Sequence, residues 1–188
     1  MTRMIGFIAE DLSDVEVIKL LIARITSKKY ASAHFVGKGC GPIKKKIPGW
    51  AKAFAHKGVK SLLIVHDLDK AVEGDLRESL EKIAGETPFS SRAVIIPKEE
   101  LEAWLLCDED AIYRALKLEK KLKAINKPEE IPSPKEFLRD LVQVHSKGRQ
   151  KQYINTIHNK LIASQLNAEK LKKCPSFNHL RVFIDSVF

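Results

Sequence analysis

Two aspartates separated by one residue follow an uninterrupted apolar run in the middle of the chain. Residues 62–65 read LLIV, and His66, Asp67, Leu68 and Asp69 come directly after them. Carboxylates with this spacing can hold a hard cation such as Mg²⁺, or supply a nucleophile or a general acid and base. The pair alone does not separate these chemistries from an ordinary turn.

Further acids follow two other apolar runs. The first group, after residues 4–9, is Glu10, Asp11 and Asp14, and the second, after residues 93–96 and Pro97, is Glu99, Glu100 and Glu102. Any one of these could simply cap a helix, and Asp11, Asp14 and Glu99 suit that role best. Three groups placed directly after strands indicate more than capping. Like charges brought together raise one another's pKa, so the arrangement favours a bound divalent cation.

The elements that must position these acids follow from the apolar pattern. Strands are predicted at 4–9, 33–36, 62–66 and 93–96, and helices at 14–29, 43–56, 72–84 and from 99 to 106. Ser13 or Asp14 is the predicted N-cap of the first helix, and a break is predicted near Pro48 in the second. Fully apolar strands alternating with helices are typical of a parallel sheet covered on both faces. The carboxyl ends of parallel strands meet at one edge, so the three acidic groups should converge.

After about residue 110 the strand signal stops. Residues 126–134 contain three prolines and predict a loop, and residues 135–188 look helical with a break at 174–176. We therefore predict an α/β domain at 1–120, with a mainly parallel four-stranded sheet flanked by helices. Residues 121–188 are predicted to form a helical extension packed on or beside it.

Composition and charge narrow the class of protein. The chain has 188 residues and a formal net charge of +9, which favours anionic partners, above all nucleic acid. Its three cysteines, Cys40, Cys107 and Cys174, are widely spaced, which argues against a disulfide framework or a zinc site and indicates reduced thiols. Because no apolar run suits a signal peptide or a membrane span, we expect a cytoplasmic protein without a membrane partner.

The ordered motifs resemble those of a known fold family. The segment EDLSD at 10–14 is similar to the E-G-x-[ST]-D opening of TOPRIM domains, and DLD at 67–69 to their D-x-D. IPKEELEAWLLCD at 96–108 resembles the P-x-x-E-x-E-x-W-L-L-x-D segment of small TOPRIM-like proteins, related to the overcoming-lysogenization-defect nucleases and often associated with phage defence. CPSF at 174–177 resembles a C-terminal element of that family. Asp11 stands where the family has glycine.

The resemblance implies a TOPRIM-like, Rossmannoid fold and a metal-dependent nuclease or related phosphodiester hydrolase. It implies that Glu10 is a metal ligand or the general acid and base. Asp67 and Asp69 would hold Mg²⁺, with Mn²⁺ as the alternative, and Glu102 would be a further ligand or support the others. A metal that polarises a phosphodiester next to a carboxylate that moves a proton is consistent with this chemistry.

A nuclease also needs positive charge along its substrate. The candidate nucleic-acid contacts are Lys38, Lys44, Lys45 and Lys46 on one side and Lys147, Arg149 and Lys151 on the other, although a surface role is the simpler reading of each lysine. The glycine-rich loop at 37–41 is neither a Walker A nor a dinucleotide motif. Any ATPase in the system would therefore be a separately encoded partner.

Two other functions fit parts of the pattern. A catalytically silent module of the same fold could bind nucleic acid or protein. A haloacid-dehalogenase-like phosphatase also places D-x-D after a buried strand, but it favours threonine or valine where this chain has Ala71.

Other side chains and properties stay open. His66 and Trp104 suit packing roles, and Tyr153 suits either base stacking or an amphipathic helix. The sequence does not decide whether the substrate is DNA or RNA, or whether one or two metal ions bind. It also leaves open whether the protein forms a homo-oligomer, what its biological trigger is, and what the helical extension does.

Overall fold

The chain folds around a four-stranded, fully parallel sheet. The computed structural model describes residues 3–37, 40–85, 89–146 and 152–188, with the backbone alone for 40–42. The strands are β1 (Met4–Ala9), β2 (Ala31–Val36), β3 (Ser61–Val65) and β4 (Ser91–Ile95), in the spatial order β2-β1-β3-β4. Their register pairs Met4 with Ala31, Ile5 with Ser61, and Ser61 with Ser91. The predicted α/β class with a parallel sheet is confirmed as a Rossmann-like fold.

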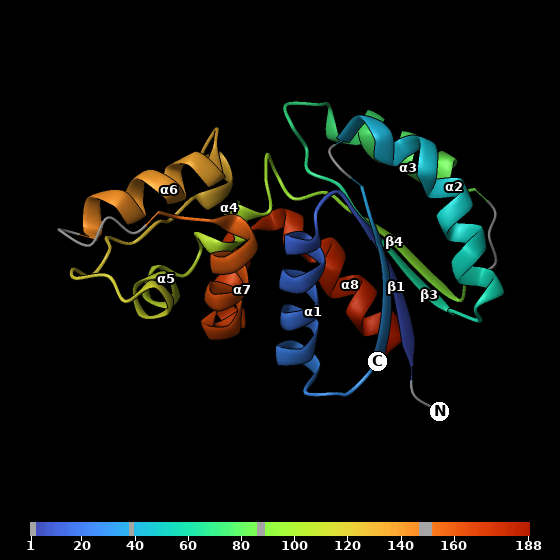
Figure 1. Ribbon diagram of the computed structural model, residues 1–188, viewed down its shortest axis with the longest axis horizontal. Helices are drawn as coiled ribbons and strands as arrows, with labels where there is room; N and C mark the ends of the chain where they lie inside the picture. The colour runs from blue at the N-terminus through green and yellow to red at the C-terminus, as the bar shows by residue number, and fades with distance from the viewer. Residues whose placement is uncertain (1–2, 38–39, 86–88, 147–151) are drawn as a thin grey trace.

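Helices cover both faces of the sheet, as Figure 1 shows. Helices α1 (Leu12–Thr26) and α8 (Asn178–Val187) lie on one face, and α2 (Cys40–His56) and α3 (Glu73–Ala84) lie on the other. Successive side chains of a strand point to opposite faces, so Phe7 joins the core under α1 while Ile8 joins the core under α2. Burial on both faces explains why the strands are apolar without alternation.

A close contact between Gly6 of β1 and Phe54 of α2 gives a first prediction. A Cβ atom on Gly6 would lie 2.9 Å from Cδ2 of the buried Phe54 ring. Gly6→Ala should therefore lower the free energy of unfolding by about 1–3 kcal/mol through overpacking. Gly49→Ala is the matched control, because no atom lies within 4 Å of its new Cβ in α2. It should raise the free energy of unfolding by about 0.5–1 kcal/mol. Urea unfolding measures both, and a neutral Gly6→Ala would contradict the packing account.

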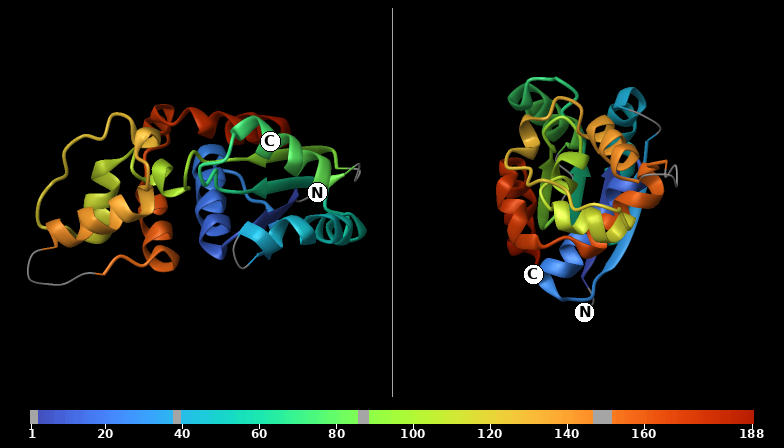
Figure 2. Two further views of the ribbon diagram at one scale, coloured as in Figure 1. Left: turned by 90° about the horizontal axis from the view of Figure 1, so that it is seen from above. Right: turned by 90° about the vertical axis from the view of Figure 1, so that its left-hand side faces the viewer.

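The helical part after β4 packs against α1 and then returns to the sheet. It comprises α4 (Glu102–Leu105), α5 (Glu109–Leu116), α6 (Pro134–His145) and α7 (Asn155–Gln165), with short 3₁₀ helices at Pro128–Glu130, Ala168–Lys173 and Pro175–Phe177. Figure 2 shows α4 to α7 beside the α/β layers. One hydrophobic cluster continues from the sheet through α1, α5, α7 and α8, so the extension is packed on the α/β part.

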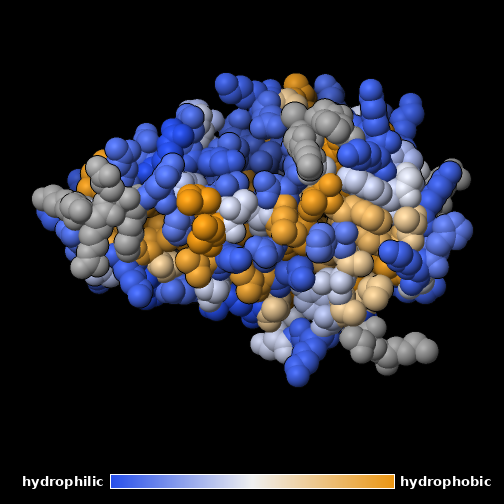
Figure 3. Space-filling model, in the orientation of Figure 1, coloured by the Kyte–Doolittle hydropathy of each residue, from blue (hydrophilic) through white to orange (hydrophobic). Residues whose placement is uncertain are grey.

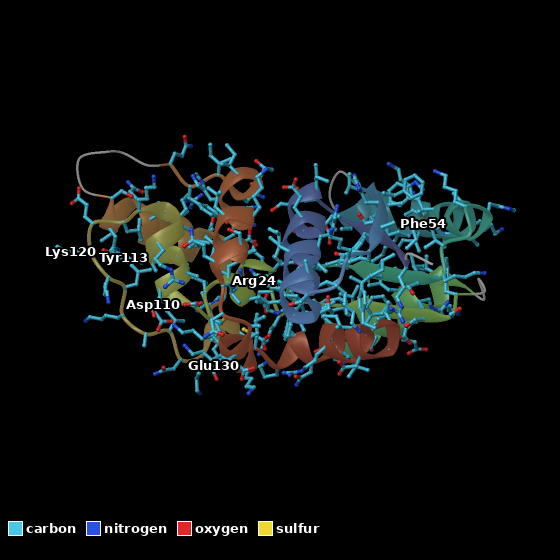
Figure 4. All side chains as sticks on the ribbon, turned by 90° about the horizontal axis from the view of Figure 1, so that it is seen from below. Arg24, Phe54, Asp110, Tyr113, Lys120 and Glu130 are labelled. Carbon is cyan, nitrogen blue, oxygen red and sulfur yellow. The ribbon has the colours of Figure 1, made fainter. Side chains whose placement is uncertain are left out.

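Specific polar contacts hold the extension in place. Arg24 reaches from α1 to α7 (Figure 4), where its Nε donates to the Leu166 carbonyl at 3.1 Å and its Nη1 to the Ser164 carbonyl at 2.6 Å. Trp104 is fully buried, which confirms its predicted core role, and its Nε1 donates to Ser176 Oγ at 2.8 Å. The two sequence segments that contain Trp104 and Ser176 therefore meet in the core.

Three predicted helix boundaries were wrong. The N-cap of α1 is Asp11, whose side chain accepts from Ser13 N–H, and not Ser13 or Asp14. Helix α2 runs through Pro48 without a break, because the buried residues before and after it, Ile47 and Ala51, hold one continuous helix face on the sheet. The helix predicted from residue 99 begins at Glu102.

The late start of α4 has a backbone cause. Glu99 has a φ of 58°, which no right-handed helix accommodates.

No helix in the described parts of the chain combines the length and the apolarity needed to cross a membrane.

Candidate metal and nucleic-acid site

The strand order creates a crevice between the ends of β1 and β3. From β1 the chain turns through α1 to β2 on one side, and from β3 it turns through α3 to β4 on the other. The loops after β1 and β3 therefore diverge, and such switch points are where open α/β sheets bind ligands. Glu10 directly follows β1, and Asp67 lies two residues after the end of β3, so both residues lie at this crevice.

Asp67 is the centre of the acidic cluster. Its Oδ1 accepts from the Leu101 N–H at 3.1 Å, which ties the end of β3 to the segment after β4. Burial raises the pKa of Asp67 well above its usual value, and the charges of Asp14, Glu102 and Glu10 raise it further. The three acidic groups that follow β1, β3 and β4 therefore meet in space, as the sequence predicted.

Asp14 belongs to the same cluster, although the sequence suggested a plain cap. Burial raises the pKa of Asp14 to about 7, and the negative charges of Glu102 and Asp11 contribute. Its Oδ2 accepts from Asp11 N–H at 3.2 Å, so Asp14 both completes a capping box and faces the other acids. At neutral pH this carboxyl group is partly protonated when no cation is bound.

Asp11 fits its position without strain. Its φ of −131° and ψ of 154° are extended backbone that any residue adopts, and its Oδ1 accepts from Ser13 N–H at 2.8 Å. The turn after β1 therefore does not need the glycine found in the TOPRIM pattern, and Asp11 replaces it with a helix cap.

Glu10 lies against the buried His66. Nδ1 of His66 lies 3.0 Å from Oε1 of Glu10. The same Nδ1 atom lies 2.7 Å from the Asp67 carbonyl oxygen. Burial lowers the pKa of His66, but Glu10 and the Asp67 carbonyl raise it more, so the net shift is upward. Neither Glu10 Oε1 nor His66 Nε2 has a well-aligned hydrogen bond among the described residues, although both atoms are buried. A buried carboxylate oxygen in this condition is suited to a cation.

A buried polar network positions Glu102. The side chain is 5 % exposed, and its Oε1 accepts from Asn159 Nδ2 at 3.0 Å and from the Tyr153 hydroxyl at 3.4 Å. Asn159 Nδ2 also donates to Ser13 Oγ at 3.0 Å, and the Tyr153 hydroxyl donates to Asn159 Oδ1. Glu102 on α4 is thus held by α7 and by the first turn of α1.

Left-handed backbone occurs in two loops at the site, at Asp69 and Lys70 after β3 and at Glu99 after β4. Asp69 and Lys70 have φ of 48° and 64°, and Ala71 N–H donates to the Leu68 carbonyl at 2.9 Å, which makes a tight turn of a type that usually contains Asn-Gly. Left-handed backbone costs a non-glycine residue of order 1 kcal/mol and is often retained at functional sites. Partial desolvation and the Glu10 charge raise the pKa of Asp69.

Cavities adjoin these loops on the side of the extension. A cavity of about 140 Å³ is lined by Asp69, Lys70, Glu99, Glu100, Pro132 and Ser133. A second, of about 580 Å³, also touches Glu100 and Ser133 and is lined in addition by Lys135, Glu136, Arg139 and residues 153–155. Glu100 Oε2 accepts from Lys135 N–H at 2.8 Å and so anchors the start of α6 at the site.

The donor set fits a hard cation in chemical type. The carboxyl groups of Asp14 and Asp67, whose pKa values are raised, lie together at the crevice, and Glu10 Oε1 has only the poorly aligned contact with His66 Nδ1 among the described residues. Within the described residues, however, no three His, Cys, Asp or Glu side chains converge on one point as a ready-made metal cage. Mg²⁺ needs only one or two protein carboxylates when waters and substrate phosphates complete its shell.

The structure describes only part of the predicted nucleic-acid contacts. Lys38, Lys147, Arg149 and Lys151 lie outside the described residues. Lys44 is close enough to His66 for its charge to lower the pKa of that histidine, Lys45 is exposed, and Lys46 lies over the Trp50 ring at 5.6 Å. Of these lysines, Lys44 is the one whose charge reaches the acidic site.

The expectation for Tyr153 was wrong, and Asp108 proves to be structural. Tyr153 is buried and bonded to Asn159 and Glu102, so it neither stacks on bases nor belongs to an amphipathic helix. Asp108, in the segment similar to TOPRIM-like proteins, caps α5 and pairs with Lys170 at 2.9 Å. Burial opposes the shift, but hydrogen bonds from Asn167 N–H, Lys170 and Ala111 N–H lower the pKa of Asp108, so Asp108 has a structural role.

Comparison with known proteins gives one match. The family model described as "Domain of unknown function (DUF4276)" matches residues 9–184. No curated protein and no solved structure matches the chain. The matched span includes Glu10, Asp67, Asp69 and Glu102 together with the helices that support them.

Proposed function

The chain belongs to this family of unknown function, DUF4276, and we propose that it is a Mg²⁺-dependent nuclease or a related enzyme that acts on phosphodiesters of nucleic acid. One observation carries the proposal: Glu10, Asp14, Asp67 and Glu102, which follow three different strands, gather at the topological switch point, where burial and the neighbouring charges raise the pKa of Asp14 and of Asp67. A purely structural role would not need several like charges in a half-buried crevice. The resemblance to TOPRIM-like proteins, which rests on several of the same acids, supports the same function.

The residues divide into three roles. Glu10, Asp67 and Asp69 would hold the cation, and Glu102, fixed by Asn159 and Tyr153, supports them. When bound, Mg²⁺ or Mn²⁺ polarises a phosphodiester and lowers the pKa of bound water. Asp14, with its pKa near 7, is suited to accept or release a proton at neutral pH.

Positive charge near the crevice supports a polyanionic substrate. Lys44 lies on the α2 side of the site, and Lys135 and Arg139 line the cavity of about 580 Å³ beside Glu100. A phosphate backbone that contacts both sides would pass over the acids. Lys135 and Arg139 are candidate substrate contacts in addition to those predicted from the sequence.

Cleavage assays test the proposal. The purified protein is incubated with supercoiled plasmid, linear duplex DNA and single-stranded RNA, in Mg²⁺, in Mn²⁺ and in EDTA. We expect cleavage of at least one substrate in the presence of metal, none in EDTA, and loss of cleavage in Glu10→Gln. Salt-sensitive binding without cleavage under any metal would favour the silent binding module. Hydrolysis of small phosphomonoesters that is lost in Asp67→Asn would favour the phosphatase.

The resemblance also extends the proposal to biological context. We propose a cytoplasmic role in phage defence, with a separately encoded ATPase as a partner. The test is protection of a bacterial host against phage by the wild-type gene but not by the Asp67→Asn gene at equal protein level.

A further inference from the structure

The edge of the sheet at β2 is open in the described structure. β2 is the outermost strand, and it pairs with β1 through contacts that begin with Ala31 N–H to the Arg3 carbonyl and end with Gly37 N–H to the Ala9 carbonyl, both at 2.8 Å. In a parallel ladder alternate residues face alternate sides, so the N–H groups of Ser32, His34 and Val36 point away from β1. The strand, ASAHFV, has no proline and no lysine, the residues that usually protect an edge.

A cationic groove runs beside this edge. It encloses about 630 Å³ between α1 and the start of β2, with Leu20, Ala23, Tyr30 and Ser32 among its lining residues. Lys19, Lys28, Lys29 and Lys160 surround it with one acid, Glu16. Lys28 Nζ donates to the Phe188 main-chain oxygen at 2.8 Å, and Lys160 lies 3.6 Å from Glu16. The groove therefore combines an apolar wall with an excess of positive charge.

The two helices that line the groove, α1 and α7, also expose apolar side chains. Ile157 and Leu161, one turn apart on α7, are 48 % and 41 % exposed, and Leu12 at the start of α1 is 43 % exposed. Figure 3 shows apolar side chains that gather over α7 and in the region of α1 and β2, interrupted by hydrophilic ones. A surface with this mixture is typical of a protein interface.

We propose that an acidic, extended segment of a partner protein docks here and pairs with β2 as a fifth strand. Its main chain would bond to the outward N–H and C=O groups of β2, its apolar side chains on one face would enter the groove, and its acids would meet the lysines. This surface contributes no acid to the cluster at the crevice, so the docking of a partner strand on β2 does not depend on the proposed nuclease activity.

The same contacts argue against other occupants. Single-stranded nucleic acid would need an aromatic platform for base stacking, but the Tyr30 ring packs on Phe188 at 5.8 Å and its hydroxyl donates to the Lys19 carbonyl. Leu20 and Ala23 suit aliphatic side chains instead. A second copy of the chain would bring two lysine-rich grooves together, which like-charge repulsion opposes.

A labelled peptide tests the proposal. The probe is a fluorescein-labelled peptide of alternating valine and threonine with two glutamates at each end, so that its acids can reach the lysines around the groove, and the control peptide has lysine in place of each acid. We expect the acidic peptide, and not the basic one, to bind by fluorescence anisotropy. Lys29→Glu should weaken binding by at least about tenfold, whereas Lys52→Glu on the remote face of α2 should change it by less than about twofold.

A proline variant separates strand pairing from simple charge attraction. Ser32→Pro removes one outward N–H and leaves the bonds to β1 in place, so it should abolish binding, while Ser32→Ala should keep it. Circular dichroism checks that both variants fold. If Ser32→Pro does not fold, the effect of Lys29→Glu on peptide binding still tests the docking proposal. Absence of binding to the wild type, or binding that Ser32→Pro and Lys29→Glu leave unchanged, would overturn the proposal. So would displacement of the peptide by duplex DNA, or a dimer in light scattering that Ser32→Pro removes.

Discussion

Asp67→Asn is expected to reduce metal-dependent cleavage by at least about 10³-fold, because it removes the charge at the centre of the carboxylate cluster. Asparagine keeps the Oδ1 that accepts from Leu101 N–H, so the connection between the ends of β3 and β4 remains. The loss should therefore appear as a lower kcat in a folded protein. The measurement is initial cleavage rate against Mn²⁺ concentration for the wild type and the variant.

Two further variants calibrate this result. Glu102→Gln should lose about 10–100-fold, because it disturbs a residue that supports the ligands through Asn159 and Tyr153. Asp185→Asn changes an exposed aspartate on α8 and should leave the rate within about twofold. If Asp67→Asn keeps cleavage within about threefold of the wild type, Asp67 does not hold the metal.

The metal-free protein is expected to become less stable as the pH rises from about 5 to 8. Asp14 has its pKa raised from 3.8 to about 7, and the pKa of Asp67 is also raised well above 3.8. A carboxyl group whose folded pKa exceeds its unfolded pKa stabilises the fold most fully below the unfolded value, and this stability is lost as the pH rises through the folded value. His66, whose pKa is also raised, acts in the same direction. The expected loss is on the order of 2–4 kcal/mol.

A neutral variant of Asp14 should weaken this pH dependence. Asp14→Asn keeps an oxygen that can accept from Asp11 N–H but cannot ionise, so it should flatten the pH profile. At pH 8 it should also raise the free energy of unfolding by about 1–3 kcal/mol in EDTA. Urea unfolding at several pH values measures the effect, with Asp185→Asn as the control. A profile that is flat in the wild type, or unchanged in Asp14→Asn, would contradict the coupling between these acids.

The sequence predicted the convergence of the acids because that convergence follows from topology. Uninterrupted apolar strands require a covered parallel sheet, and a parallel sheet brings the residues after each strand to one edge. The positions of Glu10 and Asp67 at this edge follow from the topology alone. The N-cap was misassigned because Asp11, Ser13 and Asp14 are all good caps, and the choice depends on where the backbone leaves the strand.

The support of Glu102 could not be predicted in the same way. Asn159 and Tyr153 lie 57 and 51 residues away from it in the chain, and their contact depends on how α7 packs on α1 and α4. No local pattern marks such residues. The one available signal was Asn159 itself, a polar residue at a position that falls on the buried face of its helix, next to Ile162 and Ala163.

Binding of Mn²⁺ measured by calorimetry, in two buffers with different ionisation enthalpies at about pH 6.5, tests the metal site most directly. Because Asp14 and Asp67 hold protons more strongly than ordinary aspartates, we expect saturable binding to the wild type with release of protons. We expect no saturable binding to Asp67→Asn. Absence of binding to the wild type, or equal binding to Asp67→Asn without proton release, would contradict the account.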